Sequence, residues 1–261
     1  MAVKRIGLVG CGAIGTYLAM EIRRRFKKTA RLIGVCDRNP LAAKKLNQRL
    51  SRRVPRLSLP ALIRASDLIV EAASPQAVPE LLSWVIRFRK EVMVLSTGGL
   101  LQKPDLLKKA RRLRVPIHLP SGAVAGIDGL KAHAMGKIRR VVLTTRKPLR
   151  ALPLVPGAAA RPRGLFRGSA RRAVLALPAN LNVAATLSLA GVGSTRTQVR
   201  VIADPGIRHN VHEVEVVGEA GRLISRTENR PMKDNPRTSL LAAFSAVATL
   251  QEILEPIRVG T

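Results

Sequence analysis

The chain has 261 residues, 46% of them hydrophobic, so it can bury a substantial core in one or two domains. No run of about 18 apolar residues lacks a charge or a helix breaker, so we expect no transmembrane span. The first residues already have the pattern of a strand, so we expect no signal peptide. Two cysteines, Cys11 and Cys36, fit a reducing cytoplasm better than a disulfide, and no cluster of Cys and His has the spacing of a metal site.

The net charge is +30, with 46 Lys and Arg against 16 Asp and Glu. Such a balance is typical of proteins that bind nucleic acid or another polyanion. However, the basic residues are dispersed over the polar sides of predicted helices, aromatic residues make up only 2%, and no nucleic-acid-binding motif is present. We therefore expect a solvated basic surface that attracts anionic substrates, with no specific nucleic-acid partner.

The first predicted strand runs directly into a glycine turn of the pattern G-x-G-x-x-G, at Gly10, Gly12 and Gly15. The first glycine permits a tight turn, the second lets a pyrophosphate approach the backbone, and the third lets the next helix pack closely. That helix begins near Ala13 and directs its free N–H groups and positive dipole end at the phosphates. We therefore predict that the three glycines, Ala13 and Ile14 bind a dinucleotide.

A second apolar strand ends in Asp37, close to the roughly 20 residues after the glycine turn at which an acidic residue binds the adenosine ribose. Hydrogen bonds from the ribose hydroxyls to Asp37 favour NAD. Arg38 follows directly and could pair with a 2′-phosphate, so NADP stays open. A glycine turn of another α/β protein, with Asp37 as a helix cap, is the alternative.

Predicted strands and helices alternate through the first half of the chain. The expected strands are 3–9, 31–36, 67–72, 92–95 and 115–118, and the expected helices are 13–27, 40–50, 59–65, 75–87 and 104–112. This order predicts an α/β fold whose N-terminal Rossmann domain, residues 1–118, contains a doubly wound parallel sheet. Loops at the carboxyl ends of its strands, including Ala73 and Ser74, should border the cofactor.

After residue 118 the pattern changes to a glycine-rich stretch, a Pro- and Ala-rich loop over 148–164, and strands with polar alternation. The expected strands are 140–146, 197–203, 211–217 and 222–227, and the expected helices are 169–176, one that follows Pro178, and 240–254. Polar alternation is typical of a mixed or antiparallel sheet with one exposed face. We predict a second α/β domain, catalytic and dimerising, over 119–239, with residues 240–261 packing back on the first domain.

Several of these segments together resemble the L-aspartate dehydrogenase family. The resemblance is carried by the glycine turn and by Leu119–Ala123, Gly126–Asp128, Pro178–Gly191, Asn210–Val214, Glu228–Asn229 and Asp234–Ser239. It implies an enzyme that oxidises L-aspartate with NAD or NADP to iminoaspartate, which hydrolyses to oxaloacetate and ammonia and feeds NAD biosynthesis. It also implies a homodimer.

Carried over residue by residue, the family's catalytic histidine matches His212, and its nicotinamide contacts match Ala123 and Asn182. The strong basic balance and the Pro- and Arg-rich stretch 150–163 depart from the family's pattern.

Proton transfer near neutral pH suits a histidine, and the chain offers four: His118, His133, His209 and His212. His212 begins a predicted strand within a polar run, and alternation places Asn210 on the same face. A single histidine on a strand is more often structural than catalytic. The family resemblance is therefore what favours His212 as the catalytic histidine. We expect it to exchange a proton with the substrate's amino group or with the attacking water.

A small dicarboxylic amino acid needs cationic or N–H partners. Backbone N–H groups of Ser121 and Gly122 are candidates, as are Lys233, Asn235 and Thr238 around a turn before the last helix. These residues could equally form an interdomain hinge and cap the last helix. Two other functions stay open: another reductase of similar two-domain architecture, and a non-catalytic dinucleotide-binding protein with a polyanion-binding surface.

Overall fold

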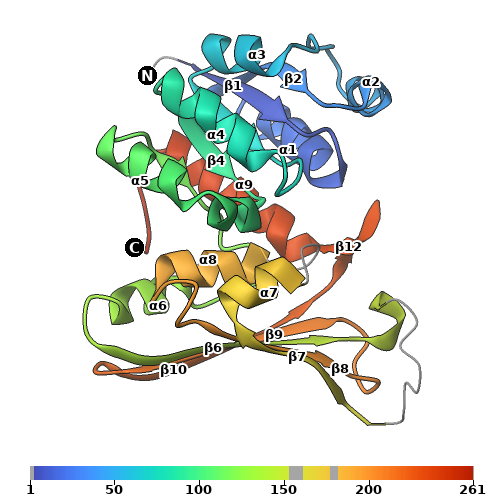
Figure 1. Ribbon diagram of the computed structural model, residues 1–261. Coiled ribbons are helices and arrows are strands. Elements are labelled where there is room, and N and C mark those ends of the chain that lie inside the picture. The colour runs from blue at the N-terminus through green and yellow to red at the C-terminus, as the bar shows by residue number, and fades with distance from the viewer. Residues whose placement is uncertain (1–2, 153–160, 177–181, 261) are drawn as a thin grey trace. The chain divides into compact units, whose positions relative to one another are not determined.

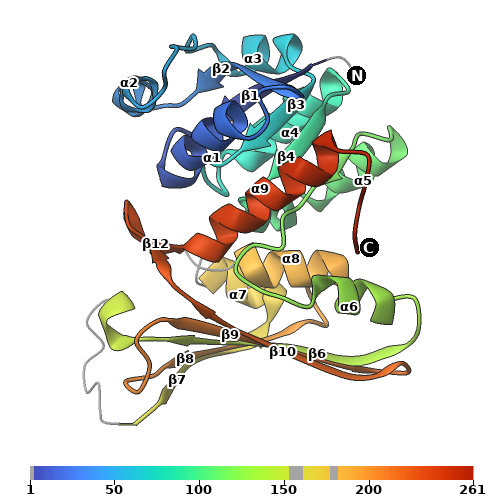
Figure 2. The same ribbon diagram turned by 180° about the vertical axis from the view of Figure 1, so that it is seen from behind.

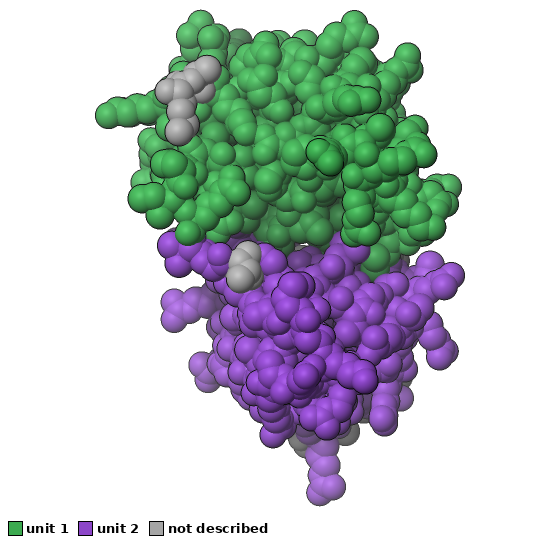
Figure 3. Space-filling model, turned by 90° about the vertical axis from the view of Figure 1, so that its left-hand side faces the viewer, with its two compact units in different colours: residues 1–120, 246–258 green, residues 121–245, 259–261 purple. Residues whose placement is uncertain are grey.

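The computed structural model describes residues 3–152, 161–176 and 182–260. The chain divides into two compact units: unit 1 comprises residues 1–120 and 246–258, and unit 2 comprises residues 121–245 and 259–261 (Figure 3). Each unit contains one five-stranded sheet, parallel in unit 1 and mixed in unit 2, which confirms the predicted fold class. None of the described helices is both long and apolar enough to cross a membrane.

The sheet of unit 1 has the strand order β2-β1-β3-β4-β5, and every neighbouring pair is parallel (Figure 1). Its strands are β1 (Lys4–Val9), β2 (Ala30–Cys36), β3 (Leu68–Glu71), β4 (Glu91–Val94) and β5 (Ile117–His118). The chain winds to one side of β1 for β2 and to the other side for β3. Ligands of such sheets bind at the carboxyl ends of the strands where the winding reverses, which here is the glycine turn after β1.

Helices connect these strands: α1 (Ala13–Arg24), α2 (Pro40–Gln48), α3 (Leu59–Ala65), α4 (Val78–Arg87), the short 3-10 helix η1 (Thr97–Gln102) and α5 (Pro104–Arg112). The cap of α2 forms as its sequence indicates, since the Asn39 side chain accepts the Leu41 N–H at 3.0 Å and Pro40 occupies the first turn. The last helix, α9 (Leu240–Leu254), contributes four side chains to the core around α1 and α2: Ala246, Val247, Leu250 and Leu254.

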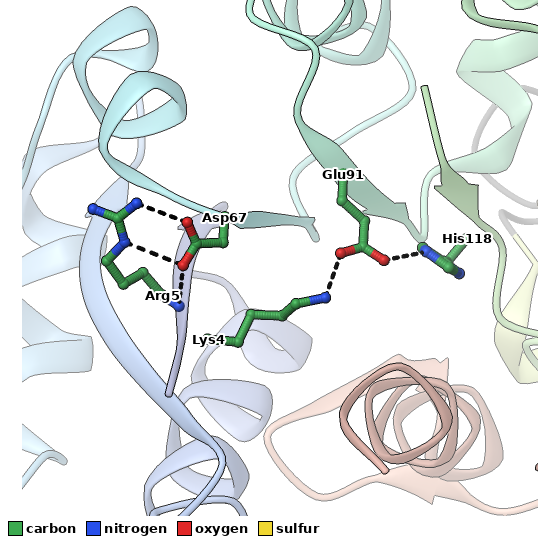
Figure 4. A network of polar contacts seen from close by, with 5 residues as sticks. All are labelled: Lys4, Arg5, Asp67, Glu91 and His118. Atoms are coloured by element: carbon green, nitrogen blue, oxygen red, sulfur yellow. Dashed lines mark hydrogen bonds and ion pairs between the residues drawn. The ribbon is translucent and has the colours of Figure 1, made fainter. Parts of the chain in front are cut away.

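Charged side chains tie together the amino-terminal ends of the unit 1 strands (Figure 4). Arg5 donates to both carboxylate oxygens of Asp67, from Nη2 at 2.7 Å and from Nε at 3.1 Å. Glu91 accepts hydrogen bonds from Lys4 and from His118, whose Nε2 lies 2.8 Å from Oε1. His118 is thus engaged in holding β5 to β1 and β4, at the end of the sheet opposite the glycine turn.

The sheet of unit 2 has the order β10-β9-β6-β8-β7, in which only β6 and β8 are parallel. Its strands are β6 (Ile138–Lys147), β7 (Arg163–Ser169), β8 (Gln198–Ala203), β9 (Asn210–Gly218) and β10 (Gly221–Asn229). Helices cover one face of the sheet (Figures 1 and 2): α6 (Ile127–His133), α7 (Ala170–Ala176) and α8 (Asn182–Ala190). A 3-10 turn, η2 (Leu149–Ala151), follows β6, and β11 (Pro231–Met232) pairs with β12 (Asn235–Ser239) in a separate hairpin.

Unit 2 differs from the sequence-based expectation in three places. Residues 163–169, partly assigned to a loop, form the edge strand β7, whose glycines and arginines hide its β pattern. Residues 127–133, which begin within the glycine-rich stretch 121–129, form α6 instead of a loop, and this helix starts after Gly126 in a left-handed conformation with φ +85°. Residues 231–239 form a hairpin instead of a turn before the last helix. Most of the stretch 150–163 lies outside the described residues.

The Glu91 cluster predicts a measurable effect on stability. Replacing Glu91 by Gln should lower the free energy of unfolding by about 1–3 kcal/mol, because two charged hydrogen bonds in a half-buried site are lost. Burial raises the pKa of Glu91, but His118 and Lys4 outweigh it and lower the pKa overall. The cluster therefore stabilises the fold above the carboxyl's ordinary pKa, and this contribution is lost as the pH falls.

Urea unfolding of the wild type and Glu91→Gln at pH 7 and in acid measures the difference. Asp105→Asn is the control, since Asp105 forms an ion pair with Lys108 in which both side chains are largely exposed. Equal losses in the two variants would refute a special role for Glu91.

Candidate active site

The three glycines of the turn after β1 have different surroundings. Gly10 has φ +96°, and a Cβ there would lie 2.5 Å from the carbonyl oxygen of Ala72. A Cβ on Gly15 would lie 2.0 Å from the carbonyl oxygen of Gly10, so α1 can pack on the turn only without it. Gly12 is exposed, and no atom of the described residues lies within 4 Å of the position that its Cβ would take. The fold therefore needs the first and third glycines, while the second leaves open space in front of α1.

That open space lies at the amino end of α1, where Gly12 is the N-cap and no side chain caps the helix. The first-turn N–H groups and the helix dipole therefore remain available to an anion. Ala13 and Ile14 are half-buried in this turn. Free N–H groups at the amino end of α1, together with the open space beside Gly12, are suited to bind the pyrophosphate of a dinucleotide.

Asp37 lies directly after β2, and its carboxylate already organises the turn. Its Oδ2 accepts the N–H of Cys11 at 2.6 Å, and its Oδ1 accepts the N–H of Asn39 at 2.8 Å. Arg56, which the sequence did not single out, donates to the Asp37 backbone carbonyl at 3.2 and 3.1 Å. Arg38 is exposed. The site thus offers one carboxylate for ribose hydroxyls and the Arg56 guanidinium beside it, with Arg38 next in the chain.

The loops after β3 and β4 are tied together by a buried carboxyl group. Glu71 has no exposed surface, and it accepts the N–H of Ala73 at 2.8 Å and the N–H of Ser96 at 2.9 Å. Burial raises the pKa of Glu71. Ala73 and Ser74 therefore follow β3 at the same edge as the glycine turn, where Ala72 approaches Gly10.

His212 lies on β9 in unit 2, directly opposite Thr145 on β6 and Thr227 on β10. Residues directly opposite in antiparallel strands point to the same face. His212 Nδ1 lies 2.9 Å from Thr145 Oγ1. Within the parts of the chain that the structure describes, no hydrogen bond is made by Nε2, which is therefore the nitrogen that can meet a substrate.

His212 is only 6% exposed, and this burial disfavours the charged form of its imidazole. Burial, and secondarily the positive charge of Lys147, lower the pKa of His212 from 6.5 to about 4. At neutral pH the ring is consequently uncharged, the state in which a histidine can accept a proton.

Ala123 is buried against the same face of the sheet as His212. Its carbonyl oxygen accepts a hydrogen bond from Thr227 Oγ1 at 2.9 Å and one from Asn229 Nδ2 at 3.0 Å. Thr227 is the direct cross-strand neighbour of His212, so the structure brings the 121–126 loop and the predicted catalytic histidine together.

The neighbours of Ala123 in this loop, Ser121 and Gly122, are half-buried. Gly122 has φ +74°, and its N–H donates to Ser245 Oγ at 3.0 Å. The backbone amide proposed for a substrate carboxylate at Gly122 is thus engaged within the protein. Both residues remain predicted substrate contacts.

The remaining predicted residues lie on other elements. Asn182 is exposed at the first position of α8. Lys233 is exposed in the turn between β11 and β12, and Asn235 and Thr238 lie on β12. The structure places the last three on the separate hairpin instead of on the five-stranded sheet that carries His212.

Two residues of the His212 face were missed from the sequence. Thr145 and Lys147 lie on β6, two residues apart, and both side chains are buried. Alternation along the strand predicts that they share a face, but their nearness to His212 depends on the pairing of β6 with β9. No motif within either strand specifies that pairing.

The glycine turn generates a matched pair of variants. Gly12→Ala should leave the free energy of unfolding unchanged and weaken NADH binding by about 10-fold or more, because its methyl group enters only the space in front of α1. Gly15→Ala should instead lower the free energy of unfolding by about 1–3 kcal/mol, because its Cβ meets backbone. Urea unfolding and NADH fluorescence titration measure both; unaltered affinity in Gly12→Ala would contradict the pyrophosphate assignment.

The buried imidazole predicts a pH dependence of stability. The folded-state pKa of His212, about 4, lies below its ordinary value of 6.5, so the unfolded chain binds the extra proton. Stability should therefore fall as the pH drops from 6.5 to 4, with a contribution from His212 of roughly 3 kcal/mol. Urea unfolding of the wild type and of His212→Gln at both pH values measures the contribution of His212. If both proteins lost the same stability between pH 6.5 and 4, His212 would not be the source of the pH dependence.

Comparisons with known proteins match both halves of the chain to dehydrogenases. A model described as the C-terminal region of aspartate dehydrogenase matches residues 128–253, and one described as the NAD-binding domain of homoserine dehydrogenase matches residues 10–120. Proteins named L-aspartate dehydrogenase from Methanosarcina barkeri and Methanocaldococcus jannaschii are 40% and 38% identical, each alignment covering 98% of this chain and 99% of the relative.

Among solved structures, the crystal structure of aspartate dehydrogenase from Thermotoga maritima has a TM-score of 0.80 at 24% identity, covering 99% of this chain and 100% of that one. This likeness concerns the fold. A homoserine dehydrogenase from Thiobacillus denitrificans is more distant, with a TM-score of 0.64 at 14% identity over 97% of this chain and 74% of its own. By its sequence relatives over nearly its full length, the chain belongs to the L-aspartate dehydrogenase family.

Proposed function

We propose that this protein catalyses the NAD- or NADP-dependent oxidative deamination of L-aspartate to oxaloacetate and ammonia, or its reverse. The observation that carries the proposal is the buried, uncharged imidazole of His212, bonded to Thr145 on the sheet face that also holds the Ala123 loop. Relatives that share this chain's full length are named for that reaction.

Unit 1 would hold the adenosine and pyrophosphate part of the cofactor. Asp37 would accept the ribose hydroxyls, the amino end of α1 would bind the pyrophosphate at Gly12, and Ala73 and Ser74 would border it. Ala123 and Asn182 are the proposed nicotinamide contacts. When bound, the nicotinamide supplies the acceptor for the hydride that leaves the substrate Cα.

His212 would handle the proton. As the Cα–H leaves as a hydride, the substrate ammonium must lose one proton to give the protonated imine. In the tautomer whose Nδ1–H donates to Thr145 Oγ1, Nε2 carries the lone pair that would accept that proton. Water then adds to the imine carbon and ammonia departs, which leaves oxaloacetate, and His212 can exchange protons with both.

The first test is a spectrophotometric assay of the purified protein. NADH or NADPH should be oxidised with oxaloacetate only when ammonia is present, with little activity on pyruvate or 2-oxoglutarate, and NAD or NADP should be reduced with L-aspartate. Relative rates rank the two cofactors. Tight cofactor binding without turnover of any of these substrates would remove the proposed reaction.

The role of His212 predicts a specific loss of turnover. His212→Asn should lower kcat by about 100- to 10,000-fold, the usual contribution of a general acid or base, and leave the Kd for NADH unchanged. Thr145→Val should cause a smaller loss, because the imidazole keeps its nitrogen but loses the partner that orients it. Near-normal turnover of His212→Asn would sink the assignment.

We also propose that the enzyme is a cytoplasmic homodimer that supplies iminoaspartate for NAD biosynthesis. Both cysteines are free thiols, and burial raises the pKa of Cys11 to about 12, so it stays protonated. Among the described residues, helices cover one face of the unit 2 sheet (Figure 2). On the other face Ile224 is exposed opposite Glu215, which forms an ion pair with Arg222. Light scattering of the purified protein tests the dimer.

A further inference from the structure

Lys147 occupies the end of β6 on the same face of the sheet as His212. It follows Thr145 by two residues, and Thr145 is the direct cross-strand neighbour of His212. Alternation therefore directs the Lys147 side chain to the helix-covered face, although a lysine at the end of a strand usually reaches solvent. The residue is only 6% exposed.

No carboxylate balances this buried ammonium among the residues that the structure describes. Asp204, whose backbone N–H donates to the Lys147 carbonyl at 2.8 Å, has a carboxylate that is already engaged. Its Oδ2 accepts a hydrogen bond from Arg146 at 3.1 Å, and its Oδ1 accepts the N–H of Gly206 at 2.9 Å. Burial alone lowers the pKa of Lys147 to about 8, and no neighbouring acid raises it. At neutral pH the group is thus still mostly charged and unpaired.

An unpaired buried charge is costly to the folded protein, and such charges are normally paired or neutralised. Cationic side chains are abundant on this chain, whose 46 Lys and Arg outnumber its acids almost threefold. The basic composition of the chain explains exposed cations, but it does not explain a buried ammonium beside the candidate catalytic histidine. A negatively charged ligand that pairs with the Lys147 ammonium would explain its burial.

We propose that Lys147 binds a carboxylate of the substrate beside His212 and so selects a dicarboxylic amino acid. The proposal rests on the function proposed above. The ammonium forms charge-assisted hydrogen bonds to the carboxylate oxygens, and a substrate without that group leaves the charge unpaired, which is a strong basis for discrimination.

The same contact links substrate binding to the proton acceptor. In the free protein the Lys147 charge helps to keep His212 unprotonated. A carboxylate placed against Lys147 offsets that charge and favours protonation of the nearby imidazole. His212 thus becomes a better proton acceptor when the substrate is in place.

The test uses Lys147→Met, which keeps the length of the side chain and removes its charge. The KM for L-aspartate should rise by about 10- to 100-fold, the range expected for a lost charged hydrogen bond, with NADH binding unchanged. If the preference for L-aspartate over L-alanine collapses, the partner is the side-chain carboxylate. If the preference persists while the KM rises, the partner is the α-carboxylate, and the proposed selection of a dicarboxylic amino acid by Lys147 is overturned. Lys137→Met, at an exposed lysine of the same unit, is the matched control and should behave like the wild type.

Stability separates this role from a merely structural one. Removal of an unpaired buried charge should leave the Tm of unliganded Lys147→Met unchanged or about 2–5 °C higher, whereas loss of a structural contact would lower it. Succinate, a dicarboxylate that needs no turnover, should raise the Tm of the wild type and of Lys137→Met but not of Lys147→Met.

These readouts keep the two proposals apart. A wild type that binds succinate through Lys147 but does not turn over L-aspartate would overturn the proposed reaction and retain the carboxylate site. An unchanged KM with an unchanged succinate shift in Lys147→Met would overturn the role of Lys147, whatever the activity. A lower Tm of the unliganded variant would also count against it.

Discussion

The pairing of β9 between β6 and β10 is the constraint on which the candidate catalytic centre depends. It sets His212 in one row with Thr145 and Thr227, and through Thr227 it positions the Ala123 loop. Side chains alternate along a strand, so a slip of one residue would replace His212 by Glu213 on this face and disperse the whole row. The buried valines that follow His212 on the same face, Val214 and Val216, oppose such a slip because it would expose them.

This face also shows how the protein combines stability with chemistry. An apolar side chain at Lys147 or His212 would be easier to bury than a titratable one, and among the described residues neither has a charged partner that offsets its burial. The neighbouring positions of the face, such as Leu143 and Val214, are fully apolar and tightly packed. The apolar neighbours thus stabilise the fold around Lys147 and His212, and they hold these two polar side chains in position for a ligand.

The sequence was most informative where the physical requirement is local. The glycine turn needs Gly10 for its backbone conformation and Gly15 for close packing, and both requirements can be inferred from spacing alone. Continuous apolar strands also predicted the parallel sheet. In contrast, the nearness of Lys147 to His212, and the bond from Arg56 to the Asp37 carbonyl, join segments far apart along the chain. Such contacts depend on strand pairing, which composition and periodicity do not encode.

The last helix has a consequence for the order in which the protein can fold. Four side chains of α9 belong to the apolar core around α1 and α2, yet they are among the last residues made by the ribosome. Residues 1–120 therefore emerge with part of their core surface uncovered, facing water until residue 254 has been synthesised. Unit 1 is first in the chain but can be completed only after all of unit 2's strands exist. The nascent protein thus leaves part of the apolar surface of unit 1 uncovered until its final helix has been synthesised.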